Sequence, residues 1–171
     1  PVPRGIDVSG LANLEKIRLV AFDVDGVFTD GRFYLSDDGV ESKTFHTQDG
    51  YGVRRLLDAG IAVAVISGRK SQAVTQRMAE LGVAHVVLGC KDKVAALDNL
   101  ATELGLSASE CAYVGDDLPD LPLLDHVGFS VAVANAVSLL QEQCDYVTGK
   151  PGGFGDVREV CDLIVAAGES T

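Results

Sequence analysis

The chain has 171 residues, of which 47% are hydrophobic and 23% are charged, and its formal net charge at neutral pH is −11. This balance is typical of a globular protein with one sizeable core, and it excludes an intrinsically disordered chain. The acidic excess excludes a nucleic-acid-binding or anionic-membrane-binding surface, because the whole chain would repel either partner. We therefore expect a single domain over residues 1–171, in which any anionic ligand is held by a local site.

The chain shows no sign of membrane insertion or export. Its longest uninterrupted apolar stretch covers residues 61–66, far short of the roughly 20 residues that a membrane-spanning helix needs. The first residues lack the apolar core of a secretory signal. Four cysteines without any CxxC spacing lie in apolar neighbourhoods, so we expect buried free thiols and a cytoplasmic location. These are Cys90, Cys111, Cys144 and Cys161.

Short apolar segments alternate with amphipathic ones along the chain. The apolar segments are almost continuously hydrophobic, which favours strands of a parallel sheet covered on both faces. They span residues 17–22, 61–66, 84–88, 111–114, 128–131 and 145–147. Apolar residues at helical spacing predict helices over 52–59, 71–81, 93–104 and 156–167. The sequence therefore predicts an α/β fold, a Rossmann-like parallel sheet with helices on both faces and right-handed crossovers.

One segment interrupts this alternation directly after the first strand. Two extended runs within residues 31–47 flank the pair Asp38-Gly39, which is typical of a β-hairpin turn. In open α/β sheets the ligand crevice lies beyond the carboxyl ends of the strands. We therefore expect this hairpin to form a flap over a site at that edge.

Polar clusters follow four of the predicted strands in turn. Parallel strands bring the loops at their carboxyl ends to one edge of the sheet, so we expect these four clusters to meet there. They are Asp23-Val24-Asp25-Gly26, Ser67-Gly68-Arg69, Lys93 at the start of a helix, and Gly115-Asp116-Asp117 with Asp120.

Several carboxylates would be crowded into that crevice. Two like charges 4 Å apart repel by roughly 4 kcal/mol at an effective dielectric constant of 20. Lys93 alone cannot offset several such repulsions, whereas a bound divalent cation can. Oxygen ligands without a nearby histidine or thiol select a hard ion, Mg²⁺ first. We therefore expect the metal-free site to be strained and Mg²⁺ to raise the stability of the protein.

This combination of groups indicates phosphoryl transfer. A cation and a lysine neutralise phosphate charge, while the Ser67 hydroxyl and nearby backbone amides donate hydrogen bonds to phosphate oxygens. An aspartate can act as a covalent nucleophile and form an aspartyl-phosphate. A second aspartate two positions further on can protonate the leaving oxygen.

The same motifs resemble those of haloacid dehalogenase-superfamily phosphatases, in the same order. Longer segments resemble the 3-deoxy-D-manno-octulosonate 8-phosphate phosphatases, and the similarity covers nearly all of residues 17–167. The resemblance is carried by residues 24–31, 49–52, 112–117, 127–128, 131–134, 152–155 and 158–159. It implies a Rossmann-like core without a large cap domain, acting on a small-molecule sugar phosphate. It also implies a homotetramer in which hairpin flaps and glycine-rich tails (about residues 149–156) complete neighbouring sites.

The resemblance also implies roles for individual residues. Asp23 would be the nucleophile, and Asp25 the general acid that later activates water. Mg²⁺ would be held by Asp23, the backbone carbonyl of Asp25, and Asp116, with Asp117 in support. The phosphate would be held by Gly26, Ser67, Gly68 and Lys93. We expect Gly26 to let backbone amides approach the phosphate because it has no side chain, and Asp120 to be either a helix cap or a partner of the site residues.

Two departures from the family pattern bear on the substrate. Relatives usually place arginine before the Asp49-Gly50 pair, where this chain has Gln48, and a cation within the glycine tail, where it has Phe154. A 2-keto sugar acid carries a carboxylate that cations would bind. A phosphorylated 2-keto-3-deoxy sugar acid, and first 3-deoxy-D-manno-octulosonate 8-phosphate, is the expected substrate, with a nonulosonate 9-phosphate as the alternative.

Two further interpretations come from other classes of protein. A phospho-acceptor signalling domain also combines carboxylates, a hydroxyl and a lysine on a doubly wound sheet, but it lacks a general acid two positions after its phosphorylated aspartate. Asp25 therefore disfavours it. A catalytically silent oligomerisation module, as is appended to sugar-nucleotide synthetases, is disfavoured because all the motif residues are present.

Overall fold

The structure, a computed structural model, describes residues 13–169. Its main sheet has six parallel strands in the order β5-β4-β1-β6-β7-β8. The strands are β1 (Leu19–Phe22), β4 (Ala62–Ser67), β5 (His85–Leu88), β6 (Cys111–Gly115), β7 (Phe129–Ala132) and β8 (Tyr146–Val147). The order runs outward in both directions from β1, so the chain crosses from one half of the sheet to the other between β5 and β6. This is the predicted Rossmann-like α/β fold.

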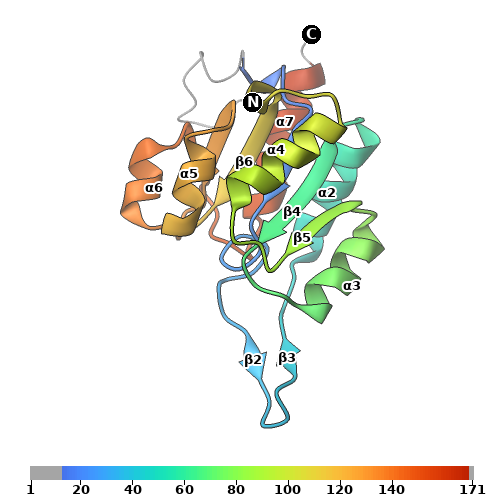
Figure 1. The fold of residues 1–171 in the computed structure, drawn as a ribbon, viewed down its shortest axis with the longest axis vertical. Helices are drawn as coiled ribbons and strands as arrows, with labels where there is room; N and C mark the ends of the chain where they lie inside the picture. Colours follow the sequence, from blue (N-terminus) through green and yellow to red (C-terminus); the bar gives the residue numbers. More distant parts are fainter. Residues whose placement is uncertain (1–12, 170–171) are drawn as a thin grey trace.

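Helices cover both faces of this sheet, as Figure 1 shows. On one face α2 packs against α7 and α3, and on the other face α4 packs against α5. These helices are α2 (Thr47–Asp58), α3 (Gln72–Leu81), α4 (Lys93–Glu103), α5 (Leu121–Leu124) and α7 (Asp156–Glu169), with α6 (Ser138–Gln143) beside β7. The 3-10 turns η1 (Ala108–Glu110) and η2 (Leu118–Asp120) flank β6.

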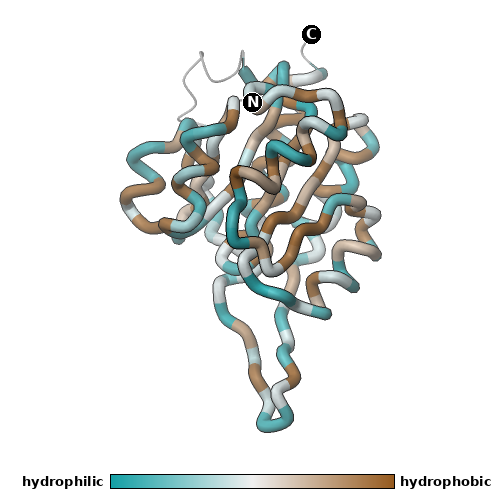
Figure 2. Tube along the Cα trace, in the orientation of Figure 1, coloured by the Kyte–Doolittle hydropathy of each residue, from teal (hydrophilic) through white to brown (hydrophobic). Residues whose placement is uncertain are grey.

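The core is built around the central strand β1, which is buried along its whole length. Parallel strands covered on both faces need apolar side chains at every position. In Figure 2 the strand segments are accordingly mostly brown, whereas the helical segments alternate between brown and teal. Phe22 at the end of β1 meets Phe28 edge to face, with ring centroids 5.3 Å apart. The last residue of β1 and the loop that follows it are therefore anchored in the core.

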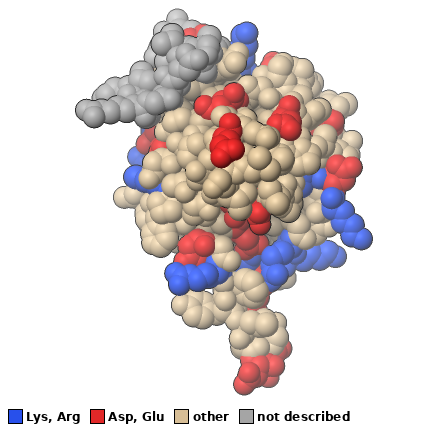
Figure 3. Space-filling model, turned by 90° about the vertical axis from the view of Figure 1, so that its left-hand side faces the viewer, with Lys and Arg blue, Asp and Glu red and all other residues tan. Residues whose placement is uncertain are grey.

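The predicted hairpin consists of β2 (Tyr34–Leu35) and β3 (Glu41–Ser42), which pair antiparallel. It projects away from the carboxyl edge of the sheet (Figure 1). Acidic side chains cover its end, and lysine and arginine side chains gather near its base (Figure 3). Its outer part points away from the sheet (Figure 1), and its role as a flap over the site stays a prediction.

Some boundaries differ from those predicted. Helix α2 begins at Thr47, five residues before the predicted start, because His46 caps it by accepting a hydrogen bond from the Gln48 amide at 3.1 Å. The short helices α5 and α6 were not predicted, since four and six residues are too few for a clear helical period.

The cysteines follow their prediction in part. All four are free, Cys111 and Cys161 are buried, and Cys90 and Cys144 are partly exposed. Among residues 13–169, the structure contains no helix that is both long and apolar enough to cross a membrane.

Candidate active site

Three aspartates meet at the carboxyl edge of the sheet. Asp23 directly follows β1, while Asp116 and Asp120 follow the neighbouring strand β6. One carboxylate oxygen from each lies within 4.8 Å of the others. The parallel pairing of Phe22 with Val114 sets this arrangement, because it brings both strands to an end at the same level. The predicted convergence of remote loops thus produces a compact acidic cluster.

The environment of Asp23 and Asp116 disfavours their charged forms. Burial, followed by repulsion from Asp120, raises the pKa of Asp23 to about 7. Burial, followed by repulsion from Asp23 and Asp120, raises the pKa of Asp116 to about 8. Carboxylates that share a crevice resist joint ionisation in this way. A cation bound between Asp23 and Asp116 would therefore stabilise the charged forms of both carboxylates.

Lys93 supplies one positive charge to this cluster from the first position of α4. Its ammonium group lies 3.2 Å from Asp23 Oδ2 and donates to Asp120 Oδ1 at 2.7 Å. Burial favours the neutral amine, but Asp23 and Asp120 more than offset burial and raise the pKa of Lys93 above its usual range. When all three carboxylates are ionised, as they would be around a bound cation, one lysine leaves the cluster with an uncompensated negative charge.

Both carboxylate oxygens of Asp120 accept hydrogen bonds. Oδ1 accepts from Lys93 and from the Tyr113 hydroxyl at 2.6 Å, and Oδ2 accepts from the amides of Asp116 and Asp117 at 3.0 and 3.3 Å. Burial works to raise the pKa of Asp120, but these partners, Lys93 first, hold it below its ordinary value. Asp120 is fully buried and is thus a partner that holds Lys93 and the loop after β6.

Asp25 faces the base of the hairpin. Lys43 donates to Asp25 Oδ1 at 2.5 Å and lies 3.4 Å from Glu41 Oε1, and its side chain is only 1% exposed. Arg69 forms an ion pair with Glu41 and lies 3.8 Å from Asp25 Oδ2. The Arg69 guanidinium also stacks 4.3 Å from the ring centre of Phe33. Alternating positive and negative groups therefore tie the hairpin to the loop that carries Asp25.

Gly26 has a steric role that the sequence did not predict, while its predicted approach to phosphate stays a prediction. Its backbone has a φ of +85°, and a Cβ atom there would lie 1.9 Å from Asp116 Oδ2. Any side chain at this position would displace the Asp116 carboxylate. Gly26 thus keeps open the space between the loops after β1 and β6, whatever its part in binding phosphate.

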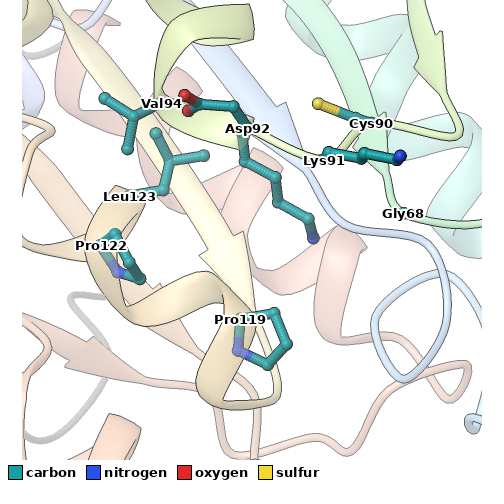
Figure 4. A pocket seen from close by; sticks show the side chains of 9 residues that line it. Gly68, Cys90, Lys91, Asp92, Val94, Pro119, Pro122 and Leu123 are labelled. Atoms are coloured by element: carbon teal, nitrogen blue, oxygen red, sulfur yellow. The ribbon is translucent and has the colours of Figure 1, made fainter.

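Ser67 and Gly68 lie at the end of β4. Ser67 is 3% exposed, and its Oγ accepts from the Arg69 amide at 3.3 Å, which leaves the hydroxyl proton free to be donated. Gly68 and Lys93 both line a cavity of about 270 Å³ beside the acidic cluster. In Figure 4 this cavity lies between the loop before α4 and the turn η2. Its other lining residues are Cys90, Lys91, Asp92, Val94, Pro119, Pro122 and Leu123.

The donor set at the cluster fits a hard divalent cation. Its available ligands are carboxylate oxygens in close proximity, which suit Mg²⁺ better than a softer metal. Each oxygen of Asp120 already accepts two hydrogen bonds. The oxygens of Asp23 have one partner each, the Val24 amide at 2.7 Å and Lys93 at 3.2 Å, so Asp23 and Asp116 keep more capacity to bind a cation. Asp117 lies further out: it is exposed, and its Oδ1 caps η2 by accepting from the Leu118 amide at 2.8 Å.

Some residues of the site were not singled out by their sequence pattern. Tyr113 lies within a buried strand and resembles any other core aromatic in the sequence. Glu41 belongs to the two-residue strand β3, and Lys43 directly follows that strand. Asn135, directly after the segment 131–134 that carries the family resemblance, donates to the Gly26 carbonyl at 3.1 Å, a contact that the resemblance did not predict. The alternation of charged residues along the hairpin was the one available indication.

Comparisons with known proteins agree with this geometry. A family model described as haloacid dehalogenase-like hydrolase matches residues 89–152. The 3-deoxy-D-manno-octulosonate 8-phosphate phosphatase KdsC of Escherichia coli K12 is 48% identical over 157 residues, covering 92% of this chain and 84% of that protein. The protein of the same name from Yersinia pestis is 46% identical over 151 residues, covering 88% and 81%.

Solved structures show the same similarity. The crystal structure of the 3-deoxy-D-manno-octulosonate 8-phosphate phosphatase from Yersinia pestis superposes with a TM-score of 0.93 at 43% identity, covering 95% of this chain and 88% of that one. The phosphatase from Moraxella catarrhalis, in complex with magnesium, phosphate and KDO, gives a TM-score of 0.92 at 42% identity, covering 95% and 93%. The family resemblance carried by the sequence motifs is confirmed. The chain belongs to the haloacid dehalogenase-like hydrolases and, within them, to the 3-deoxy-D-manno-octulosonate 8-phosphate phosphatase family.

Proposed function

We propose that this protein is a Mg²⁺-dependent phosphatase that hydrolyses 3-deoxy-D-manno-octulosonate 8-phosphate. The observation that carries the proposal is the cluster of Asp23, Lys93 and Asp116 at the carboxyl edge of the sheet, in a chain of this family. The Moraxella catarrhalis relative, whose structure holds magnesium, phosphate and KDO, supports the choice of cofactor and substrate.

The proposed reaction proceeds in two displacements. An Asp23 carboxylate oxygen attacks phosphorus, the bond between phosphorus and the sugar oxygen breaks, and Asp25 donates a proton to that oxygen. A water molecule then gives a proton to Asp25 and attacks the aspartyl-phosphate, releasing inorganic phosphate and the free carboxylate of Asp23. Mg²⁺, when bound by Asp23, Asp116 and the Asp25 carbonyl, neutralises phosphate charge. Asp117 would support the ion from outside this set.

The phosphate would lie between Lys93 and the end of β4. Lys93 would supply a cation, Ser67 its free hydroxyl proton, and Gly26 and Gly68 closely approaching backbone. Lys43 forms an ion pair with Asp25 Oδ1 at 2.5 Å. Since the first displacement needs protonated Asp25, this ion pair must open before the leaving oxygen can be protonated, which requires a movement at the base of the hairpin.

Replacing Asp23 with Asn tests the chemistry. We expect hydrolysis of p-nitrophenyl phosphate by the wild type only with Mg²⁺, and a loss of at least about 1,000-fold in kcat in Asp23→Asn, because an amide is not a nucleophile. Circular dichroism checks that the variant is folded. Asp58→Asn, an exposed position on α2, serves as the matched control. Normal turnover in Asp23→Asn would refute the nucleophile assignment, and an inactive wild type would favour a silent oligomerisation module.

The identity of the sugar is tested by comparing kcat/KM across substrates. We expect 3-deoxy-D-manno-octulosonate 8-phosphate to exceed nonulosonate 9-phosphates and hexose phosphates by more than about tenfold, or 1.4 kcal/mol of transition-state discrimination. The nonulosonate alternative is included because this chain has Gln48 and Phe154 where relatives usually have cations that would bind the sugar carboxylate. Phe154 is 57% exposed. A preference for a nonulosonate 9-phosphate would overturn the substrate assignment while leaving the chemistry intact.

We also propose that the protein acts as a homotetramer in which hairpins and glycine-rich tails complete neighbouring sites. Support comes from the apolar side chains that the hairpin exposes, Phe33, Tyr34, Leu35 and Val40, of which Tyr34 is 75% exposed. The single-domain organisation over residues 1–171 and the cytoplasmic location stay predictions.

A further inference from the structure

Two buried aspartates lie outside the cluster, where α2 and α7 pack together. Asp49 is in the first turn of α2 and Asp156 is the first residue of α7, and they are 1% and 0% exposed. Asp49 Oδ1 accepts from the Arg158 amide at 3.0 Å, and Asp156 Oδ1 accepts from the Gly153 amide at 3.2 Å. The Oδ2 atoms of both side chains are buried without a hydrogen-bond partner.

Such a pair is unstable when both groups carry a charge. A buried carboxylate oxygen without a partner costs free energy, and two neighbouring carboxylates repel each other. One proton removes the repulsion, because it leaves a single negative charge on the pair.

The surroundings decide which aspartate carries the charge. Burial raises the pKa of Asp49, while the amides of Arg158 and Gly155 and the positive charge of Lys150 oppose this rise. His46, whose Nδ1 accepts from the Gln48 amide, also faces Asp49. On α7, Arg158 is engaged with Asp162 at 2.9 Å, and Cys161 is a buried neutral thiol beside both aspartates. Burial, followed by repulsion from Asp49, raises the pKa of Asp156 to about 8. The proton therefore belongs on Asp156 Oδ2.

Asp156 is connected to the candidate active site through two glycines. The Gly153 amide that Asp156 accepts from also donates to the Val27 carbonyl at 2.9 Å. The neighbouring Gly152 amide donates to Asn135 at 2.6 Å, and a Cβ atom on Gly152 would lie 1.9 Å from the Gly26 carbonyl oxygen. The glycine segment thus packs directly against the loop that carries Asp25 and Gly26.

We propose that Asp49 and Asp156 share one proton, and that this pair makes Asp156 a positioning residue that holds Gly152 and Gly153 against the catalytic loop. Removal of the proton leaves two buried charges at the junction of α2 and α7. The first turn of α7 and the glycine segment then separate from α2, and the loop after β1 loses its support.

Melting temperatures measured against pH test the shared proton independently of activity. Wild type, Asp156→Asn and the exposed control Asp58→Asn are melted between about pH 5 and pH 9 in saturating MgCl₂, so that the acidic cluster stays ionised in each. Asn reproduces the protonated form, because it carries no charge and its oxygen can accept from Gly153. We expect Asp156→Asn to melt progressively higher relative to wild type as the pH rises, and Asp58→Asn to run parallel to wild type. Parallel curves for Asp156→Asn would overturn the shared proton.

Steady-state kinetics test the positioning role, which rests on the proposed function. We expect Asp156→Ala, which loses the acceptor for Gly153, to lower kcat for p-nitrophenyl phosphate at neutral pH by about tenfold with little change in KM. Asp156→Asn should restore kcat and extend activity to higher pH than wild type. Equal kcat in all three proteins at every pH would overturn the positioning role. A wild type without activity would instead refute the proposed function, and the melting curves would still decide the shared proton.

Discussion

Asp116 and Asp120 show how neighbours set the properties of one residue type. Both follow β6 within five residues, yet the pKa of Asp116 is raised to about 8, whereas the pKa of Asp120 is lowered. Both are desolvated by burial, but only Asp120 receives Lys93, Tyr113 and two backbone amides. Asp120 is thus permanently ionised and fixes the lysine, and Asp116 is left to bind a cation.

Gly26 gives a prediction at the same scale. We expect Gly26→Ala to weaken Mg²⁺ binding at least about tenfold, or 1.4 kcal/mol, because the new methyl group would displace the Asp116 carboxylate. Gly39→Ala is the matched control, since Gly39 also has a positive φ, +79°, but a methyl group there would have no other atom within 4 Å. Both variants incur left-handed backbone strain of about 1–2 kcal/mol. Calorimetric titration measures the Mg²⁺ affinity of each variant, and the difference between them reports the clash with Asp116. Equal affinities would contradict this steric role of Gly26.

At the scale of elements, the ends of β1 and β6 form a site whose charge opposes folding in the absence of metal. The pKa values of Asp23 and Asp116 are raised on folding, to about 7 and about 8. Between about pH 4 and pH 8 the folded state therefore binds more protons than the unfolded state, and the free energy of unfolding falls as the pH rises. Each unit of pKa shift corresponds to about 1.4 kcal/mol.

We therefore expect a Mg²⁺-induced rise in melting temperature that is larger at about pH 8 than at about pH 5, where protons compete with the ion. Differential scanning calorimetry with and without MgCl₂ measures it, and CaCl₂ provides a comparison with a larger ion. An Asp116→Asn variant should lose most of the rise. A metal effect that is independent of pH would mean that the two carboxylates are not its ligands.

The elements that the sequence predicts best are those with an unambiguous hydrophobic period. The central strands and helices α3, α4 and α7 agree with their predicted spans to within a few residues, because each buries one continuous apolar run or face. Helices α5 and α6 are too short to show a period. The start of α2 depends on a histidine cap, which apolar spacing does not reveal.

The site likewise contains contacts that the sequence predicts and contacts that it does not. The predicted strand ends show which aspartates converge, because parallel pairing makes β1 and β6 end at the same edge of the sheet. The contacts of Lys43 with Asp25 and of Asn135 with Gly26 depend on where the hairpin and a distant loop come to lie. The steric role of Gly26 depends on a tertiary approach of two loops. Such contacts are not encoded in any local pattern.

At the scale of the whole molecule, the hairpin carries an exposed apolar surface that a single copy does not cover. Phe33, Tyr34, Leu35 and Val40 are between 40% and 75% exposed. Adjacent apolar side chains in contact with water favour association, whereas the charged end of the hairpin remains in solvent (Figure 3). The proposed homotetramer would bury this surface.

Light scattering tests the assembly. We expect the wild type to have the mass of four chains and the double variant Tyr34→Asp, Leu35→Asp to have a lower mass, because charges cannot be buried unpaired. Leu139→Asp, at an exposed position of α6, is the control. A wild type that is monomeric and fully active would contradict both the tetramer and the sharing of sites.

The pairing of β1 with β6 has a consequence for ion selectivity. The Asp23 amide donates to the Val114 carbonyl at 3.0 Å, so peptide hydrogen bonds continue to the point where the two acidic loops leave the sheet. Neighbouring strands stand about 4.8 Å apart in any sheet, and this interval sets how far apart the two acidic loops begin. Mutations in the loops can therefore change the groups presented to an ion, while the points at which the two loops leave the sheet stay fixed by the strand pairing.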